Sequence, residues 1–346
     1  MEEEQKKMEE ENLSQDKVEG ENISQEEQPQ KEQPQKVKTN LIVKKDYSQV
    51  FGESALKEIE KERITFSDVY KKQRKMNTTL IIVFGLVALG GFIGLSNVSF
   101  YAALAVVVVF LIGLYVYSAR MKKKIETDMH NYMDAYFTLS NHYVMDNKEI
   151  SELQCDSQGK LADDDFTKAG FISEVSHVGS RNLVLGKMSD VSFKAADCIA
   201  KVKNDRKLEV AYLGKFFIFQ AEKTSEYKTL IYINPKEENG AGPNDLEGLD
   251  EIKTLELPSS IRVWSNDPQV KKRFTKKMKE ALSAFSPNEI LIDVAISFIQ
   301  DRICVALSYH DDVMVIPLLD PLKKEPLQQY REDVDKLSTW ITTLKK

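Results

Sequence analysis

The chain has 346 residues, with 42% hydrophobic and 29% charged side chains and a formal net charge of −6. This balance is no general signature of nucleic-acid binding, which favours a clustered excess of Lys and Arg. The three cysteines, Cys155, Cys198 and Cys304, are odd in number and widely spaced. Such spacing argues against a disulfide framework or a paired-cysteine zinc site, and it favours reduced thiols in the cytosol.

The first segment, residues 1–42, is rich in Glu, Gln, Lys and Pro and has few apolar side chains. A segment of this composition cannot bury enough surface to offset the entropy of ordering. Short repeats point the same way, because residues 11–15 return in altered form as residues 21–25. We therefore expect a disordered acidic tail, and its start lacks the apolar region of a cleavable secretory signal.

Residues 80–97 and residues 100–118 are two runs without any charged side chain. At about 1.5 Å per residue each run is roughly 27 to 30 Å long as a helix, which matches the hydrocarbon core of a bilayer. We expect a two-helix transmembrane hairpin over residues 79–119, with its turn at residues 96–99. The alternative is a helical hairpin buried in a soluble core, which two adjacent uncharged runs of this length disfavour.

Cationic side chains flank both runs and are absent from the turn. They are Lys71, Lys72, Arg74 and Lys75 before the first run, and Arg120, Lys122, Lys123 and Lys124 after the second. The positive-inside rule then places both flanks in the cytoplasm. We expect a protein of the plasma (inner) membrane with cytoplasmic N- and C-termini. The runs contain no ionisable residue for an ion pathway, so they are predicted to be an anchor.

Gly90 and Gly94 form a GxxxG pair in the first run. This spacing lets another helix backbone approach closely, and two partners fit it. One is the second run of the same chain, which has small side chains at Ala102, Ala103 and Ala105. The other is a second copy of the chain, which would make the protein a homo-oligomer.

Helical periodicity continues on both sides of the two runs. Residues 46–76 place apolar side chains on one face and charged side chains on the other, so we expect amphipathic juxtamembrane helices there, broken near residues 63–67. Their acid content favours packing on the soluble domain over adsorption to the bilayer, because interfacial helices are usually rich in Lys and Arg. An apolar stripe over residues 121–145 predicts a helix that leaves the membrane.

The remaining residues, 146–346, form short apolar or alternating runs separated by polar turns. Short connections between neighbouring runs favour antiparallel pairing, and no βαβ series is evident. We therefore predict an α+β cytoplasmic domain with a mostly antiparallel sheet and flanking helices. The expected strands are residues 182–186, 191–202, 210–220, 229–233, 261–264, 290–299, 303–308 and 313–316.

Two helices are predicted in this domain. One begins at Asp267 and Pro268, because Asp caps free amide groups and Pro fits the first helical turn. Its apolar face includes Phe274 and Met278. The other lies near the C-terminus and contains Trp340, which we expect in core or rim packing.

The first of these helices carries six cations on its remaining surface, and it is the local feature that suggests a ligand. They are Lys271, Lys272, Arg273, Lys276, Lys277 and Lys279. Near an anionic leaflet each could add roughly 1 kcal/mol if it reached the surface. Three interpretations stay open: a solvated helix face, a surface for anionic lipid or an acidic partner, and a nucleic-acid surface. Binding of single-stranded nucleic acid is disfavoured, because no aromatic side chains that could stack on bases accompany these cations.

No phosphate-binding glycine loop, nucleophile elbow, HExxH or CxxC pair occurs in the sequence. No catalytic residue, metal site or cofactor is therefore predicted. A site built from scattered strands leaves no motif, however, so the acidic run Asp163, Asp164 and Asp165 stays a candidate for metal binding. Cys198 and Cys304 lie in apolar strand-like runs and are predicted core residues.

Six short segments occur in the order found in a known bacterial family. They are residues 182–186 (NLVLG), 191–193 (VSF), 213–217 (LGKFF), 263–267 (VWSND), 296–298 (ISF) and 303–306 (ICVA). In these motifs, and in its layout over roughly residues 50–340, the chain resembles the bacterial membrane proteins with a domain of unknown function 3137. The resemblance implies an amphipathic N-terminal helix, two adjacent spans and a C-terminal cytoplasmic domain. It implies no activity.

The leading hypothesis from the sequence is a non-enzymatic, membrane-anchored interaction protein. Its cytoplasmic domain would bind a protein partner or anionic lipid of the inner leaflet. Two alternatives stay open. One is a metal-dependent enzyme with a site scattered over the soluble domain, and the other is an accessory subunit of a membrane transport complex.

Overall fold

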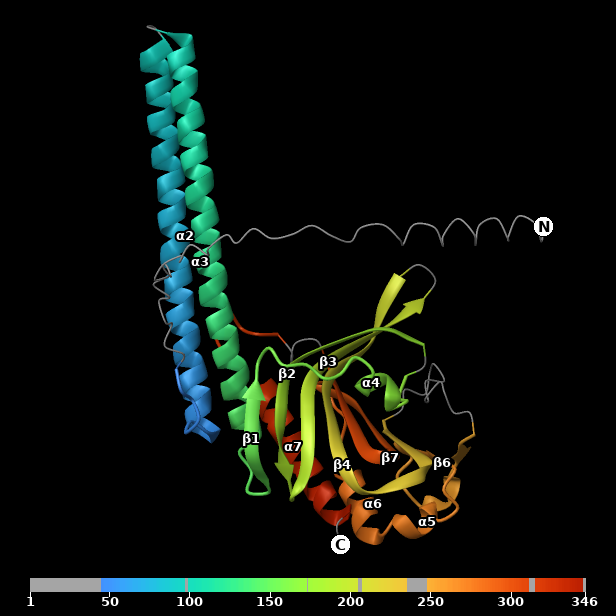
Figure 1. The fold of residues 1–346 in the computed structure, drawn as a ribbon. Coiled ribbons are helices and arrows are strands. Elements are labelled where there is room, and N and C mark those ends of the chain that lie inside the picture. The colour runs from blue at the N-terminus through green and yellow to red at the C-terminus, as the bar shows by residue number, and fades with distance from the viewer. Residues whose placement is uncertain are drawn as a thin grey trace, which may run out of the picture. The chain divides into compact units, whose positions relative to one another are not determined.

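The computed structural model describes residues 45–96, 99–172, 174–204, 207–234, 248–310 and 315–344. The chain divides into two units, and every helix and strand described below belongs to the second, Asp46–Lys346. The predicted tail of residues 1–42 lies outside the described residues. In the second unit, a long helical hairpin projects from a sheet domain (Figure 1).

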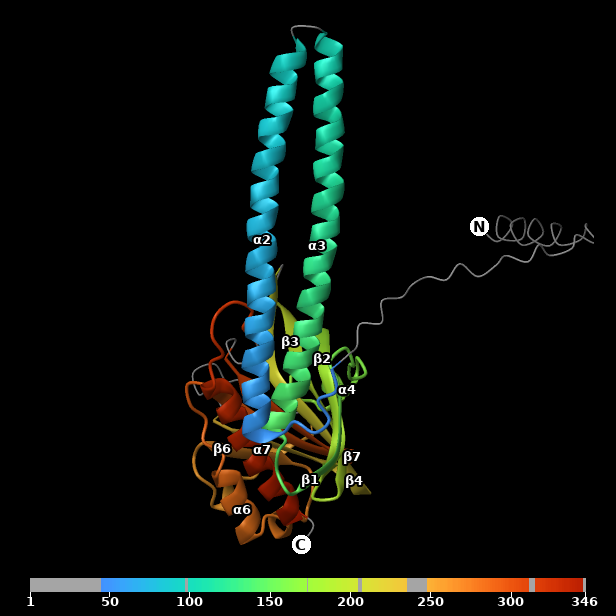
Figure 2. The same cartoon turned by 90° about the vertical axis from the view of Figure 1, so that its left-hand side faces the viewer.

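The helical hairpin consists of α2 (Gly52–Ser96) and α3 (Phe100–Val144), each 45 residues long. The two helices lie side by side in both views (Figures 1 and 2). Ser99 starts α3, since its hydroxyl accepts a hydrogen bond from the backbone N–H of Ala102. Both helices are long and apolar enough to cross a membrane, and their apolar stretches are almost wholly exposed.

The predicted break near residues 63–67 is wrong, because α2 is continuous from Gly52 to Ser96. The apolar pattern shifts there for another reason. Arg63 turns inward and donates to both carboxylate oxygens of Glu60 and to the carbonyl of Leu319 at 3.0 Å, while Ile64 points outward and is 47% exposed. A buried arginine that donates from all three of its side-chain nitrogen atoms therefore occupies a position that the sequence pattern assigns to an apolar residue.

The prediction that the juxtamembrane residues pack on the soluble domain is confirmed. Ala55, Leu56 and Ile59 of α2 belong to the same buried cluster as the sheet. On α3, the hydroxyl of Tyr132 donates to the carbonyl of Pro317 at 2.6 Å, and its ring stacks on Phe66 with centroids 5.3 Å apart. We call residues 80–118 the outer half of the hairpin, and residues 52–79 with 119–144 the inner half.

The described strands form one seven-stranded sheet in which every pairing is antiparallel, as predicted. The strand order is β1-β2-β3-β4-β6-β5, and β7 pairs with β4 on the edge that β3 and β6 leave open. The strands are β1 (Ile150–Asp156), β2 (Val175–Met188), β3 (Val191–Asn204), β4 (Lys207–Ile233), β5 (Asp250–Glu251), β6 (Ile261–Ser265) and β7 (Leu291–Tyr309).

Several strands differ from their predicted bounds. β1 was not predicted, because an irregular register between Ser151 and Gln154 breaks the alternation of its apolar side chains, which are only half-buried against the larger core. β4 and β7 each join two predicted strands, since the irregular register near residues 220–225 bends the pair without ending it. Of the strand predicted at residues 313–316, the last two residues are described and are not in a strand.

Both faces of the sheet are covered, which explains the unbroken apolar run in β4. Phe217 and Phe219 face the larger core, where the inner end of α3 packs with α6 (Lys276–Ser283) and α7 (Glu325–Leu344). Phe216 and Ile218 face the smaller core beneath α4 (Asp165–Lys168). Alternate side chains point to opposite faces, so a strand buried on both sides carries apolar residues at every position.

The helices of the sheet domain confirm one prediction and correct another. α7 is the expected amphipathic helix, and its Trp340 is fully buried in the core. The helix predicted from Asp267 onward is divided into α5 (Val270–Arg273) and α6. Asp267 lies before α5, where its carboxylate accepts from the N–H of Gln269, and Thr275 caps the start of α6.

Candidate functional site

The predicted cationic residues gather on α5 and α6, and we call them the basic surface. They are Lys271, Lys272, Arg273, Lys276, Lys277 and Lys279. The fold places them outward because the apolar side of the two helices, which includes Val270, Phe274, Met278 and Leu282, is buried in the larger core. Hydrophobic burial thus orients the cations, and the split between α5 and α6 does not hide them.

Only two of these six cations have an ion-pair partner within the described residues. Arg273 is held by the buried carboxylate of Asp267, with Nε and Oδ2 2.9 Å apart. Lys276 and Glu280 lie 3.9 Å apart on the open surface of α6, where such a pair contributes little. Lys271, Lys272 and Lys277 are exposed and Lys279 is half-buried, so four ammonium groups stay available for an external anion.

The basic surface lies at the far end of the sheet domain from the apolar tip of the helical hairpin. Figures 1 and 2 show α5 and α6 beyond the inner end of the hairpin, on the side opposite to the turn between α2 and α3. An anchoring bilayer would surround the outer half of the hairpin. The basic surface therefore lies at the end of the molecule opposite to the exposed apolar residues of the hairpin.

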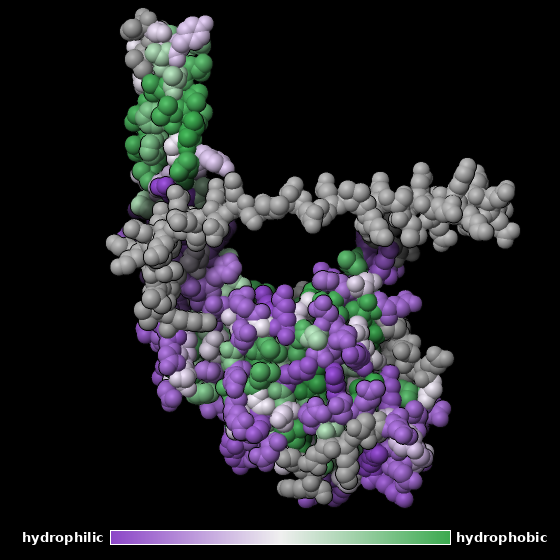
Figure 3. Space-filling model, viewed as in Figure 1, coloured by the Kyte–Doolittle hydropathy of each residue, from purple (hydrophilic) through white to green (hydrophobic). Residues whose placement is uncertain are grey.

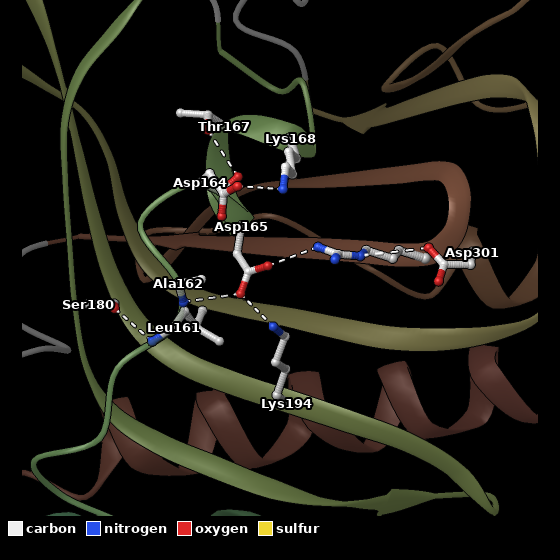
Figure 4. Close-up of polar contacts among 10 residues, drawn as sticks. Leu161, Ala162, Asp164, Asp165, Thr167, Lys168, Ser180, Lys194 and Asp301 are labelled. Atoms are coloured by element: carbon white, nitrogen blue, oxygen red, sulfur yellow. Dashed lines mark hydrogen bonds and ion pairs between the residues drawn. The ribbon is translucent and has the colours of Figure 1, made fainter.

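The acidic run at residues 163–165 is not an open group of carboxylates. Figure 4 shows the buried Asp165 at the centre of a polar cluster. One of its oxygens pairs with Lys194 at 2.5 Å and accepts from the N–H of Ala162 at 3.2 Å, and the other pairs with Arg302 at 2.9 Å. Asp164 pairs with Lys168.

These contacts change what the acidic run can do chemically. A divalent metal needs carboxylate oxygens that are free to coordinate it. Both oxygens of Asp165 are already neutralised by cations from β3 and β7, and Asp163 and Asp164 are exposed. Among the described residues, no group of three or more His, Cys, Asp or Glu is arranged to hold a metal ion.

A second buried ion pair, missed by the sequence reasoning, lies on the opposite face of the sheet. Lys215 of β4 pairs with Asp197 of β3, and both side chains are less than 10% exposed. Asn182 donates to Asp197 at 3.2 Å, and Asn141 of α3 donates to Asn182 at 2.7 Å. The ammonium of Lys215 also lies 5.0 Å from the ring centre of Tyr330. The sequence held one indication of this buried pair, because Lys215 lies within an apolar run.

This polar chain joins α3 to the centre of the sheet. Its members contact one another and are buried, so we assign it a structural role in fixing how the inner half of the hairpin docks. Asn182 has a positive φ of 58° at an irregular point of the β2–β3 pairing. The hydrogen bonds of Asn182 to Asn141 and Asp197 hold it in this conformation, which local sequence alone would not favour.

The three cysteines behave as core residues. Burial raises the pKa of Cys155, Cys198 and Cys304 to about 12 in each case. The thiolate is the nucleophilic form of cysteine, and almost none is present at neutral pH with such a pKa. These thiols are therefore poor candidates for catalysis.

The glycines of the first apolar run divide into two sets. A Cβ atom on Gly91 would lie 3.5 Å from a methyl group of Val106, so Gly91 faces α3. Cβ atoms on Gly90 and Gly94 would meet nothing within 4 Å. Of the two partners that fit the GxxxG pair, the second run of the same chain does not contact it in the structure, and the face of Gly90 and Gly94 is open.

Comparison with known proteins finds one distant structural similarity. No family model matches the chain, and no curated protein matches it. Among solved structures, the crystal structure of the mycobacterial trehalose monomycolate transport factor A, TtfA, is similar over 54% of this chain and 88% of its own. The identity is 11% and the TM-score is 0.30, values too low to assign a shared fold or role.

Proposed function

We propose that this protein is a membrane-anchored docking protein whose basic surface binds an acidic segment of a cytoplasmic partner. The observation that carries the proposal is the group of four unpaired lysines on α5 and α6, held outward by a buried apolar face. A negatively charged partner would be attracted to such a surface and oriented by it.

The anchor rests on the outer half of the helical hairpin. Figure 3 shows a band of hydrophobic residues along the visible face of this part of the molecule. Leu86 and Leu111 are 65% and 60% exposed, as expected for side chains that contact lipid. An apolar surface of this extent would aggregate in water, so a bilayer is its natural solvent. The cationic flanks favour an orientation with the sheet domain in the cytoplasm, at the inner membrane.

An acidic protein segment explains the basic surface better than the anchoring bilayer does. The surface lies at the end of the sheet domain away from the membrane (Figures 1 and 2). Lipid headgroups attract cations only within about a Debye length, roughly 8 to 10 Å. A segment of a cytoplasmic protein can reach this surface without restriction.

Two alternatives from the sequence, a metal-dependent enzyme and a subunit of a transport complex, can be compared with this proposal. The neutralised carboxylates of Asp165 give no support to a metal-dependent enzyme. If the acidic partner is itself a transporter, the protein is an accessory subunit of a transport complex. We also keep the resemblance to the family of domain of unknown function 3137 as a proposal.

The test is site-specific photo-crosslinking of the full chain in intact cells, from position 277 on the basic surface. We expect one discrete adduct that disappears when Lys271, Lys272 and Lys279 are changed to Glu. The matched control changes the exposed Lys323 and Lys324 to Glu, which alters the net charge at another site and should leave the adduct unchanged. An adduct that survives the reversal of the basic surface would refute the proposal.

A further inference from the structure

The adjoining ends of β3 and β4 are the part of the sheet domain that extends furthest toward the outer half of the helical hairpin. They are the pair of yellow strand ends in Figure 1, and the turned view in Figure 2 shows them at the same level. We call residues 201–204 and 207–210 the β3–β4 tip. Because the outer half of the hairpin is the proposed anchor, the β3–β4 tip is the part of the sheet nearest to the bilayer.

One face of the β3–β4 tip combines apolar and cationic side chains. Lys203 pairs across the strands with Leu208, and Lys201 pairs with Val210. Residues directly opposite each other in an antiparallel pair share a face. The four side chains therefore form one small surface of two lysines and two large hydrophobic residues. The other face carries Val202, Asn204, Lys207 and Glu209, and there Asn204 donates to Glu209 at 3.2 Å.

The apolar side chains of this face are unusually exposed. Leu208 is 57% and Val210 is 55% exposed, and among the large hydrophobic residues described outside α2 and α3 only Val315 exceeds them. Hydrophobic atoms are visible at the β3–β4 tip in Figure 3. Single exposed hydrophobic residues are common in soluble proteins, but two that share a face with lysines at the end of a hairpin are a typical interfacial pattern.

Cationic residues on α2 mark the level of the lipid headgroups. Lys71, Arg74 and Lys75 line a shallow groove together with Thr78 and Thr79, directly before the first apolar run. The groove is thus the boundary between the inner and outer halves of α2. Both the groove and the β3–β4 tip lie on the side of the sheet domain from which the hairpin projects (Figure 1).

We propose that the β3–β4 tip is a second membrane contact, which inserts Leu208 and Val210 into the interface of the anchoring bilayer. Lys201 and Lys203 extend their ammonium groups to lipid phosphates while their aliphatic stems stay beside the apolar pair. Neither lysine has an ion-pair partner in the described part of the chain, so both are available to anionic lipid. The proposal rests on the anchor proposed above.

The experiment uses the full chain in nanodiscs and tryptophan quenching by lipids brominated on their acyl chains. Its two native tryptophans, Trp264 and Trp340, are buried and provide a constant background. The test variant is Leu208→Trp. Leu86→Trp, in the outer half of the hairpin, is the positive control, and Leu185→Trp, at an exposed position near the C-terminal end of β2, is the negative control.

We expect Leu208→Trp to lose emission in brominated nanodiscs, as Leu86→Trp does, while Leu185→Trp keeps its emission. Adding Lys201→Glu and Lys203→Glu should reduce the quenching of Leu208→Trp in nanodiscs with anionic lipid. Unquenched Leu208→Trp beside quenched Leu86→Trp would overturn the second contact and leave the anchor intact. A blue shift without quenching would mean that protein covers the tip, which also overturns the proposal. Unquenched Leu86→Trp would overturn the anchor itself.

Discussion

The two halves of the helical hairpin are built from the same two helices, yet they are packed very differently. In the outer half, α2 and α3 share a narrow contact that includes Phe84 against Phe110, with ring centres 5.8 Å apart, and Gly91 against Val106. In the inner half, the same helices are also buried against α7 and the sheet. Each continuous helix therefore has an exposed apolar half and a half that is packed against the sheet domain.

A regular spacing runs through both halves of α3. Its buried or half-buried positions toward α2 are residues 103, 106, 110, 114, 117, 121, 125, 128 and 132. The steps repeat as three, four and four residues, which is an 11-residue period and lies close to the natural 3.6 residues per turn. The two helices can therefore stay in contact with little supercoiling, and the contact continues across the boundary of the apolar runs.

The largest effect is expected where the inner half meets the sheet. Asp197→Ala leaves Lys215 buried without its partner and should lower the free energy of unfolding by roughly 3 to 5 kcal/mol. Chemical unfolding of the full chain in detergent micelles measures this loss. The double variant Asp197→Leu with Lys215→Met removes both charges and should recover most of it, because an apolar pair needs no compensation. Equal losses in the two variants would contradict this account.

A matched pair of leucines compares the two halves directly. Leu139 of the inner half is 0% exposed and Leu111 of the outer half is 60% exposed. Leu139→Ala should lower the free energy of unfolding by about 2 to 5 kcal/mol through the cavity it leaves. Leu111→Ala should change it by no more than about 0.5 kcal/mol. If both variants unfold at the same denaturant concentration, the halves do not differ as described.

Two neighbouring glycines sharpen the description of the outer half. Gly91→Leu places a large side chain against Val106 and should cost roughly 1 to 3 kcal/mol by overpacking. Gly90→Leu meets nothing in the chain, so its unfolding should match the parent. Crosslinking in membranes then reports self-association. Loss of crosslinked dimers in Gly90→Leu alone would assign the open glycine face to a second copy, and the reverse order of stabilities would refute the assignment of faces.

The smallest expected effect is a pH dependence at the inner end of α3. Burial lowers the pKa of His142 below its ordinary value of 6.5. The unfolded chain then binds more protons than the folded chain as the pH falls from 6.5 toward the lowered pKa, so acidification destabilises the fold over that window. Melting temperatures between about pH 7.5 and about pH 5.5 should fall less steeply in His142→Gln. An unchanged slope in that variant would assign the pH dependence to other groups.

The sequence predicted the features that depend on local pattern. Apolar runs without charge, amphipathic periods and alternating strands require only neighbouring residues, and so the hairpin, the α+β class and α7 were found. The division between α5 and α6 was also within reach, since Thr275 is a good capping residue placed before a short apolar repeat.

Features that depend on distant residues could not be predicted in this way. Whether Arg63 points inward depends on a carbonyl 256 residues later. Whether Lys215 is a buried cation depends on Asp197 in the adjacent strand, and whether Asp165 is open to metal depends on Arg302 in β7. The basic surface was correctly placed on helices by its residues, but its distance from the hairpin tip is a property of the whole fold.

The hydrogen bond between Arg63 and Leu319 has a consequence for folding during synthesis on the ribosome. At about 5 to 20 residues per second, the ribosome reaches Leu319 roughly 13 to 50 s after Arg63. The outer half of the hairpin is complete long before then. The guanidinium of Arg63 therefore stays uncovered by Leu319 while most of the sheet domain is still being made.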